Sequence, residues 1–143
     1  MRILGLDIGE RRIGIALSDE RGIIARGLET IMRDNDLIAV NEIYKLVEKY
    51  NVEKIVYGMP FDKDGKIGKQ GEETLSFVSK LNSLKGVELV QWDERFSTKE
   101  ATRALIEGNV RRKKRKALKD KVSAVIILQA YLDSIGTLGK REK

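Results

Sequence analysis

The chain has 143 residues, of which 41% are hydrophobic and 35% are charged, and its formal net charge is +6. That length suits a single domain with one core. Because the sequence contains neither Cys nor His, it excludes disulfides, thiolate nucleophiles, and imidazole bases or metal ligands. Acid–base or metal chemistry must therefore fall to carboxylates, Lys, Tyr or bound water, and oxygen ligands favour hard cations such as Mg²⁺ or Mn²⁺.

The start of the chain predicts an antiparallel meander. Residues 2–8 form an apolar strand, residues 9–12 form a turn, and residues 12–18 form a second strand in which large apolar side chains alternate with small ones. A third strand is expected over residues 22–30. The sequence shows no signal-peptide pattern and no apolar run long enough to span a membrane, so we expect a cytoplasmic protein without a membrane partner.

Helices and strands alternate in the rest of the chain. Apolar spacing and caps predict helices over residues 36–50, through Leu75 to Leu81, over 97–108 and over 117–135. Between them lie predicted strands at 54–58 and 87–92 and a glycine-rich mobile loop at 62–71. This order predicts one α/β domain over residues 1–135 with a C-terminal tail at 136–143. Its mixed five-stranded sheet combines the antiparallel three-strand meander with two parallel strands, flanked by helices.

The positive charge is concentrated in one tract of six consecutive cations, and the rest of the chain is neutral. The tract consists of Arg111, Arg112, Lys113, Lys114, Arg115 and Lys116. Because adjacent cations repel one another, we expect a mobile loop here. We interpret the tract as a contact for a nucleic-acid backbone. The alternatives are a solvated loop that only aids solubility and a nuclear localisation signal, for which nothing else in the chain speaks.

Asp7 is a charged residue inside an apolar strand, where a carboxylate is costly unless it is paired or bound to a metal. Three nearby glycines leave room around it for a ligand, which favours a functional role. The alternative is a salt bridge to Arg11 or Arg12.

Two further places in the sequence offer carboxylates. Asp93 and Glu94 follow the strand 87–92 and point to opposite faces by alternation, so we expect only one of them to bind a ligand. Asp120 shares a helical face with Ala124 and Ile127, although a plain interaction with the helix dipole also explains it. Carboxylates converging on one face of a sheet are the arrangement that holds two Mg²⁺ ions for phosphodiester hydrolysis.

Four blocks of sequence, taken together, resemble the YqgF family, also called the RuvX or Holliday-junction-resolvase-like family. They are residues 4–16 (LGLDIGERRIGIA), 58–71, 93–98 (DERFST) and 119–133. The blocks occur in the family's order and span nearly the whole chain. The first and third blocks are the specific ones.

The resemblance implies an RNase H-like fold and a cytoplasmic nuclease, dependent on Mg²⁺ or Mn²⁺, that is proposed to process the 5′ end of the 16S ribosomal RNA precursor. It also implies that Asp7, Glu94 and Asp120 are the catalytic, metal-binding carboxylates. Residues expected to hold nucleic acid are Arg11, Arg12, Arg95, Ser97, Thr98 and the tract from Arg111 to Lys116. Structured RNA is the expected partner, with ribosomal precursor particles as its setting.

Three other functions stay open at this point. A four-way DNA junction as substrate would require a symmetric dimer, whereas we expect a monomer or a weak homodimer. The protein could also bind RNA without cutting it. Finally, Asp7 and the following Ile-Gly-Ile-Ala segment resemble the phosphate-binding hairpin of actin-like and sugar-kinase ATPases, which close two such lobes over a nucleotide.

Overall fold

The computed structural model describes residues 2–84, 86–96 and 112–141. Within these ranges, only the backbone is described for residues 96, 112–121 and 137–141. The predicted helix over residues 97–108 lies outside the described residues.

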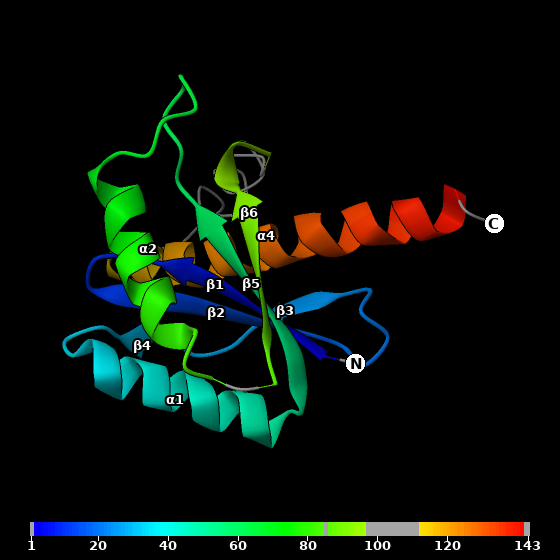
Figure 1. Ribbon diagram of the computed structural model, residues 1–143, viewed down its shortest axis with the longest axis horizontal. Helices are drawn as coiled ribbons and strands as arrows, with labels where there is room; N and C mark the ends of the chain where they lie inside the picture. The colour runs from blue at the N-terminus through cyan, green and yellow to red at the C-terminus, as the bar shows by residue number, and fades with distance from the viewer. Residues whose placement is uncertain (1, 85, 97–111, 142–143) are drawn as a thin grey trace.

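A mixed sheet in the order β3-β2-β1-β5-β6 forms the centre of the molecule, and β4 pairs with β2 beside β3 (Figure 1). The strands are β1 (Arg2–Ile8), β2 (Arg12–Ser18), β3 (Ala25–Gly27), β4 (Ile31–Met32), β5 (Val52–Met59) and β6 (Glu88–Asp93). β2 runs antiparallel to β1, whereas β5 and β6 run parallel to β1. The predicted α/β class and the mixed sheet are therefore confirmed.

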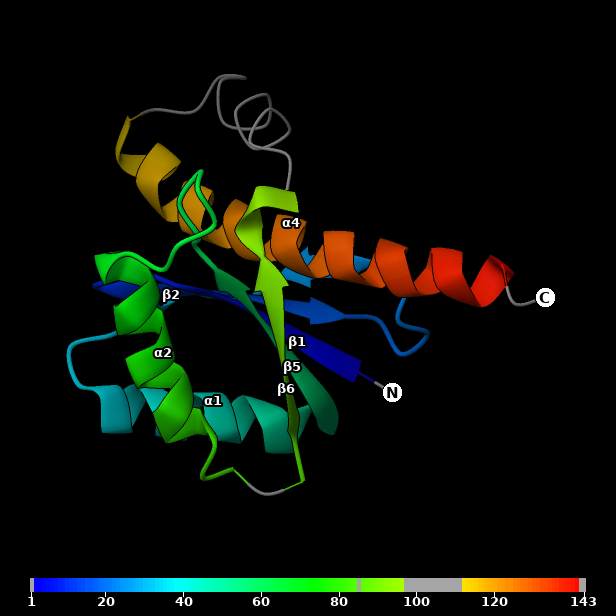
Figure 2. The same ribbon diagram turned by 45° about the horizontal axis from the view of Figure 1, so that its top comes forward.

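Helices cover both faces of the sheet. One face is covered by α1 (Asp36–Lys49) and α2 (Lys69–Leu81), and the other by α4 (Arg112–Arg141). A short 3-10 helix, η1 (Glu94–Phe96), follows β6. Figure 2 shows α4 running across the sheet in the direction opposite to β1. No helix within the described ranges combines the length and apolar character needed to cross a membrane.

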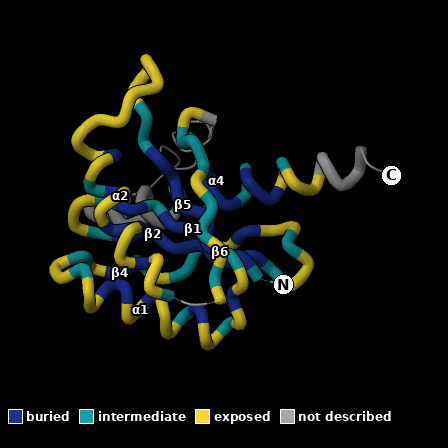
Figure 3. The backbone as a smooth tube through the Cα atoms, in the orientation of Figure 1, coloured by how far each residue is buried: buried dark blue, intermediate teal, exposed yellow. Residues whose placement is uncertain are grey.

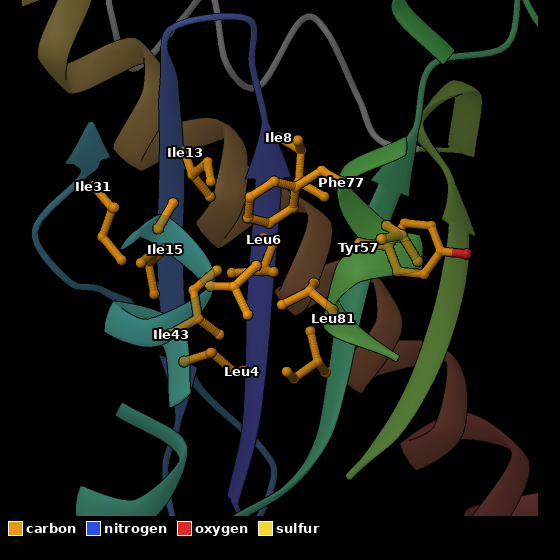
Figure 4. Packing of buried hydrophobic residues seen from close by; sticks show 14 of the residues in the cluster. Leu4, Leu6, Ile8, Ile13, Ile15, Ile31, Ile43, Tyr57, Phe77 and Leu81 are labelled. Atoms are coloured by element: carbon orange, nitrogen blue, oxygen red, sulfur yellow. The ribbon is translucent and has the colours of Figure 1, made fainter. Parts of the chain in front are cut away.

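The alternation of side chains along β1 separates two cores. Leu4, Leu6 and Ile8 pack with Ile43 of α1 and Phe77 of α2 in the larger core (Figure 4). The smaller core lies under α4 and includes Ile3, Ala16, Val56, Ala124, Ile127 and Leu128. Figure 3 shows this buried sheet beside the exposed segment between β5 and α2. Because the side-chain period of a strand is two, the positions between Leu4, Leu6 and Ile8 on β1 face the smaller core.

One aromatic contact in the smaller core joins β6 to α4. The ring of Trp92 meets the ring of Tyr131 edge-on, with 6.0 Å between the ring centroids. Tyr131 also accepts a hydrogen bond of 2.9 Å from Lys54 of β5. The helix is thereby fixed to β5 near the beginning of that strand and to β6 near its end.

The third predicted strand, over residues 22–30, is wrong in its extent. Backbone amides of Ile23 and Ile24 donate to the carboxylate of Asp19 at 2.7 and 3.1 Å, which continues the turn to residue 24. Since these amides are held by a side chain, they do not enter a ladder. Two short strands, β3 and β4, stand in place of the single expected one.

The glycine-rich loop over residues 62–71 is shorter than predicted, because α2 begins at Lys69 and includes Gly71. A Cβ on Gly71 would lie 2.7 Å from Cγ2 of Ile67, so this glycine lets the helix pack against its own approach segment. The remaining loop is closed by Asp62, whose carboxylate accepts hydrogen bonds from the amides of Asp64 and Lys66.

The mobile loop predicted for the cationic tract is wrong for residues 112–116, which form the first turns of α4. Lys and Arg are good helix formers, and a helix turns successive side chains by about 100°, which separates their charges around the axis. The helix also runs beyond its predicted end at residue 135 to Arg141, through most of the expected tail. Arg111 lies outside the described residues.

Candidate active site

Asp7 lies near the end of β1 on the face that α4 covers. Its cross-strand partner is Gly14 of β2, which contributes no side chain to this face. Two residues earlier, a Cβ on Gly5 would lie 2.7 Å from Cβ of Leu128, so α4 approaches the strand closely there. The apolar residues on either side of Asp7 belong to the opposite core, and this fixes its orientation. A half-buried carboxylate therefore lies at the edge of the smaller core.

Glu94 begins the 3-10 helix that follows β6, and its side chain lies across Gly58 of β5. A Cβ on Gly58 would fall 2.7 Å from Oε1 of Glu94 and 2.7 Å from Cδ1 of Ile127. The carboxylate therefore occupies space that only a glycine at position 58 leaves open.

Asp7 and Glu94 converge at the C-terminal ends of the parallel strands. The β1–β5 register pairs Leu6 with Tyr57, so the next positions along the two strands are Asp7 and Gly58. Neighbouring strands are separated by about 4.8 Å. The side chain of Glu94 lies over Gly58 of β5, so the two carboxylates lie over neighbouring strands at the same level of the sheet.

Asp93 serves a different purpose from its neighbour Glu94. Asp93 pairs with Met59, a residue of the larger core, and its carboxylate accepts hydrogen bonds of 3.0 and 2.6 Å from Nε and Nη2 of Arg95. These bonds hold the pKa of Asp93 below its ordinary value, against the opposing effect of partial burial. The expectation that the two carboxylates point to opposite faces is confirmed, and Glu94 is the one on the face of Asp7.

The course of α4 across the sheet determines which of its residues approach this site. Tyr131 contacts Lys54 near the start of β5, whereas Ile127, one turn earlier, contacts Gly58 near the end of the same strand. The helix and β5 thus run in opposite directions, so residues near the start of the helix lie closest to the site.

Position 120 lies at the level of Asp7 in this arrangement. The carbonyl oxygen of Ala124 lies 3.3 Å from the place of a Cβ on Gly5. Asp7 lies about 6.8 Å beyond Gly5 along the strand. Asp120 precedes Ala124 by one helical turn, about 6 Å in the same direction. Because the side chain of Asp120 is not among those described, its role as a third ligand stays a prediction.

The donor set fits a divalent cation of the Mg²⁺ or Mn²⁺ type. Asp7 and Glu94 offer carboxylate oxygens, which these hard cations prefer. Among the side chains that the structure describes, no three acidic residues gather closely enough to form a metal site. A complete site of this kind needs a further ligand, and Asp120 remains the one that the sequence predicts.

The residues predicted to hold nucleic acid fall into four groups. Arg11 is exposed and Arg12 half-buried in the turn after Asp7. Arg95 is anchored by Asp93 and lies over the ring of Phe61 at 5.3 Å, with 43% of its side chain exposed. Ser97, Thr98 and Arg111 lie outside the described residues. The backbone of residues 112–116 leads directly into the turn that carries Asp120.

Gly58 is a site residue that the sequence patterns do not assign to the chemistry. It lies in the second of the four blocks that resemble the family, but nothing in the spacing distinguishes it from a strand terminator. A glycine inside an apolar strand is a signal that something approaches the backbone closely. The identity of the approaching group, Glu94, depends on the strand register and is visible only in the fold.

Comparisons with known proteins show to which family the chain belongs. A family model described as RuvX, Holliday junction resolvase, matches residues 1–134. A relative from Clostridium botulinum is 47% identical over 135 residues, covering 94% of this chain and 98% of its own length. One from Bacillus cytotoxicus is 48% identical over 136 residues, covering 94% and 99%. The names of both relatives give them a proposed role as pre-16S rRNA nucleases.

Two solved structures share the fold at low sequence identity. RuvC of T. thermophilus, in complex with a Holliday junction substrate, is similar with a TM-score of 0.61 and 14% identity, over 96% of this chain and 97% of RuvC. The fowlpox virus resolvase, in complex with Holliday junction DNA, gives a TM-score of 0.59 and 14% identity, over 94% and 99%. These likenesses identify the fold as RNase H-like.

Proposed function

The chain belongs to the RuvX family, and on that basis we propose that it is a divalent-metal-dependent nuclease that processes the 5′ end of the 16S ribosomal RNA precursor. The observation that carries the proposal is the convergence of Asp7 and Glu94 at one end of the sheet, with the Glu94 side chain in the space left by Gly58 on β5, the strand next to that of Asp7. The names of the relatives supply the choice of RNA as substrate.

Asp7, Glu94 and Asp120 are the proposed ligands of Mg²⁺ or Mn²⁺. When bound at such a site, a pair of these ions supplies an activated water and stabilises the leaving oxygen of a phosphodiester. The chain's own contribution is to hold the carboxylates in a fixed arrangement. The strand pairing of Asp7 and the position of Glu94 against Gly58 both serve that purpose.

The cationic residues are proposed to hold the RNA backbone. Arg11 and Arg12 lie four and five residues after Asp7, and Arg95 follows Glu94 directly, so each carboxylate of the described site has a guanidinium nearby in sequence. Ser97 and Thr98 are proposed to contribute hydroxyl groups. The first turns of α4, residues 112–116, add positive charge on the approach to Asp120.

We place this activity in the cytoplasm, on ribosomal precursor particles, with the protein acting as a monomer or a weak homodimer. A monomer suffices for trimming one strand of RNA. It does not suffice for cutting two strands of a junction in concert, which requires a symmetric pair of sites.

Cleavage of four-way DNA junctions is the second candidate function. It is favoured by the family's description and by the two junction-bound resolvases that share the fold. The two candidates use the same carboxylates and differ in substrate and in oligomeric state.

The decisive experiment incubates the protein with Mg²⁺ or Mn²⁺ and two labelled substrates, a precursor-rRNA 5′ fragment and a four-way DNA junction. We expect cutting of the RNA, and its loss in Asp7→Asn and Glu94→Gln. The exposed Glu53→Gln on β5 is the matched control and should cut normally. Symmetric nicking of the junction alone would replace the RNA proposal with the resolvase. Binding of both substrates without cutting of either would contradict the nuclease.

A further inference from the structure

Arg33 is a buried cation between the candidate site and the two helices on the other face of the sheet. Only 9% of its side chain is exposed. Its Nε and Nη2 atoms donate to the carboxylate of Asp36, at 2.9 and 3.4 Å, and Nη2 also donates to the carbonyl of Glu73 at 3.3 Å. The guanidinium lies 5.0 Å from the ring centroid of Phe77. It therefore ties the start of α1 to α2.

The same guanidinium reaches the turn that follows Asp7. Nη1 of Arg33 donates to the carbonyl of Gly9 at 3.0 Å, and the backbone amide of Arg33 donates to the carbonyl of Arg11 at 2.8 Å. The turn is closed internally by the amide of Gly9, which donates to the carbonyl of Arg12 at 2.9 Å. One residue thus fixes two carbonyl groups of a turn that begins two positions after Asp7.

We propose that Arg33, oriented by Asp36, is a positioning residue that sets the conformation of the Gly9–Arg12 turn, and with it the placement of Asp7, Arg11 and Arg12 toward metal and substrate. This inference rests on the proposed nuclease function. The rigid planar fork of an arginine suits the task, because it can satisfy a carboxylate and two carbonyls in fixed directions at once. A lysine ammonium could replace the charge but not this geometry.

The alternative is that Arg33 stabilises the fold without affecting the chemistry. Lys80 provides the control, because its Nζ donates to the same carboxylate of Asp36 at 2.7 Å. Unlike Arg33, Lys80 forms no hydrogen bond with the turn within the part of the chain that the structure describes, and its side chain is 41% exposed. Substitution of either cation weakens the Asp36 cluster, but only substitution of Arg33 releases the carbonyl of Gly9.

The test compares full-length Arg33→Met, Arg33→Lys and Lys80→Met at a temperature at which thermal melts show all three folded. The readouts are Mn²⁺ affinity by electron paramagnetic resonance, kcat and KM on the precursor-rRNA 5′ fragment, and amide NMR shifts of residues 7–12. We expect both Arg33 variants to lose about 10- to 100-fold in Mn²⁺ affinity or kcat, the range typical of residues that orient metal ligands. KM should change less, and the amide shifts should move.

Lys80→Met should stay within about twofold of the unmodified protein in both readouts, below the range typical of residues that orient metal ligands. The inference is overturned if Arg33→Lys behaves like Lys80→Met, or if the amides of residues 7–12 keep their shifts in both Arg33 variants. If Arg33→Met does not fold, Arg33→Lys decides alone. A protein that neither binds Mn²⁺ nor cuts RNA, but whose turn shifts in Arg33→Lys, would contradict the proposed function while leaving the role of Arg33 in the turn intact.

Discussion

Glu94 rests against the backbone of Gly58, with Oε1 only 2.7 Å from the place where a Cβ on that glycine would lie. The contact joins a residue that follows β6 to the adjacent strand β5, and Ile127 of α4 lies 2.7 Å from the same place. A carboxylate, a strand and a helix therefore meet where one methyl group is missing.

Gly58→Ala should displace Glu94 and thereby impair metal binding. We expect at least a tenfold loss of Mn²⁺ affinity and of RNA cleavage, in the range typical for a disturbed metal ligand. Overpacking should also lower the free energy of unfolding by about 1–3 kcal/mol. Isothermal titration calorimetry with Mn²⁺ and urea unfolding provide the two measurements.

Gly5→Ala is the matched control for that variant, because its new Cβ would also meet α4, at 2.7 Å from Cβ of Leu128. It should lose at least as much stability, because the Cβ of Leu128 is fixed to the helix backbone, and it should retain more of its Mn²⁺ affinity, since it does not touch Glu94. Equal losses of affinity in the two variants would show that any crowding under α4 disturbs the site, and that Gly58 has no special part in it.

Asp120→Asn should weaken Mn²⁺ binding and abolish RNA cleavage, because the backbone register places position 120 at the level of Asp7. Asp133→Asn is the control on the same helix, where Asp133 accepts a hydrogen bond from Gln129 and is exposed. Calorimetry and a gel-based cleavage assay check both. A normal metal affinity in Asp120→Asn would remove this residue from the ligand set.

Cations on different sides of the first turns of α4 should contribute unequally to RNA binding. By helical spacing, Lys113 and Lys116 share a face with Asp120, whereas Lys114 and Arg115 lie on the far side. The plot of log affinity against log salt concentration has a negative slope. Neutralising Lys113 and Lys116 together should reduce the steepness of this slope by about 1.4, if each contacts one phosphate of a single strand.

The far-side pair offers a control of equal charge for this comparison. Substituting glutamine for Lys114 and Arg115 should leave the slope nearly unchanged. Filter binding at several salt concentrations gives both slopes. Identical slopes for the two double variants and the unmodified protein would show that the tract is ordinary surface.

The pairing of Asp93 with Arg95 should make stability depend on pH in a defined direction. Arg95 holds the pKa of Asp93 below its ordinary value of 3.8, so the folded state favours the ionised carboxylate. The stabilisation is therefore present above the ordinary pKa and lost as the pH falls through the lowered one. At pH 7, Asp93→Asn should unfold at a lower urea concentration than the unmodified protein. The difference between the two unfolding midpoints should narrow as the pH falls below the ordinary pKa of Asp93. A difference in midpoint that stays constant in acid would contradict a stabilising role for the ionised Asp93.

The sequence predicted the parts of the fold that depend on local periodicity. Strands over residues 2–8 and 12–18 and the helix over 36–50 follow from spacings of two and 3.6 residues, which need no tertiary information. The third strand failed because Asp19 captures two backbone amides, a contact that side-chain periodicity does not reveal. The prediction of a cationic loop failed because the helix propensity of Lys and Arg outweighs the repulsion between their charges.

The candidate site divides in a similar way. Asp7 is anomalous in its own strand and is visible from sequence alone. The proposed choice of Glu94 over Asp93 comes from the family resemblance, and the pairing of Asp93 with Arg95, which favours that choice, appears only in the structure. Arg33 and Gly58 could not be assigned because their partners are distant in sequence and are brought to them by the sheet.

The edge-on contact between Trp92 and Tyr131 has a practical consequence for observing the protein at work. Trp92 is the only tryptophan in the sequence, and it lies two residues before Glu94 on β6 while touching the helix that carries Asp120. Its intrinsic emission therefore comes from a single place, beside the proposed chemistry and at the seam between β6 and α4. A ligand that shifts β6 relative to α4 should therefore change the fluorescence of Trp92, and binding can be followed without a label and without a substitution in the chain.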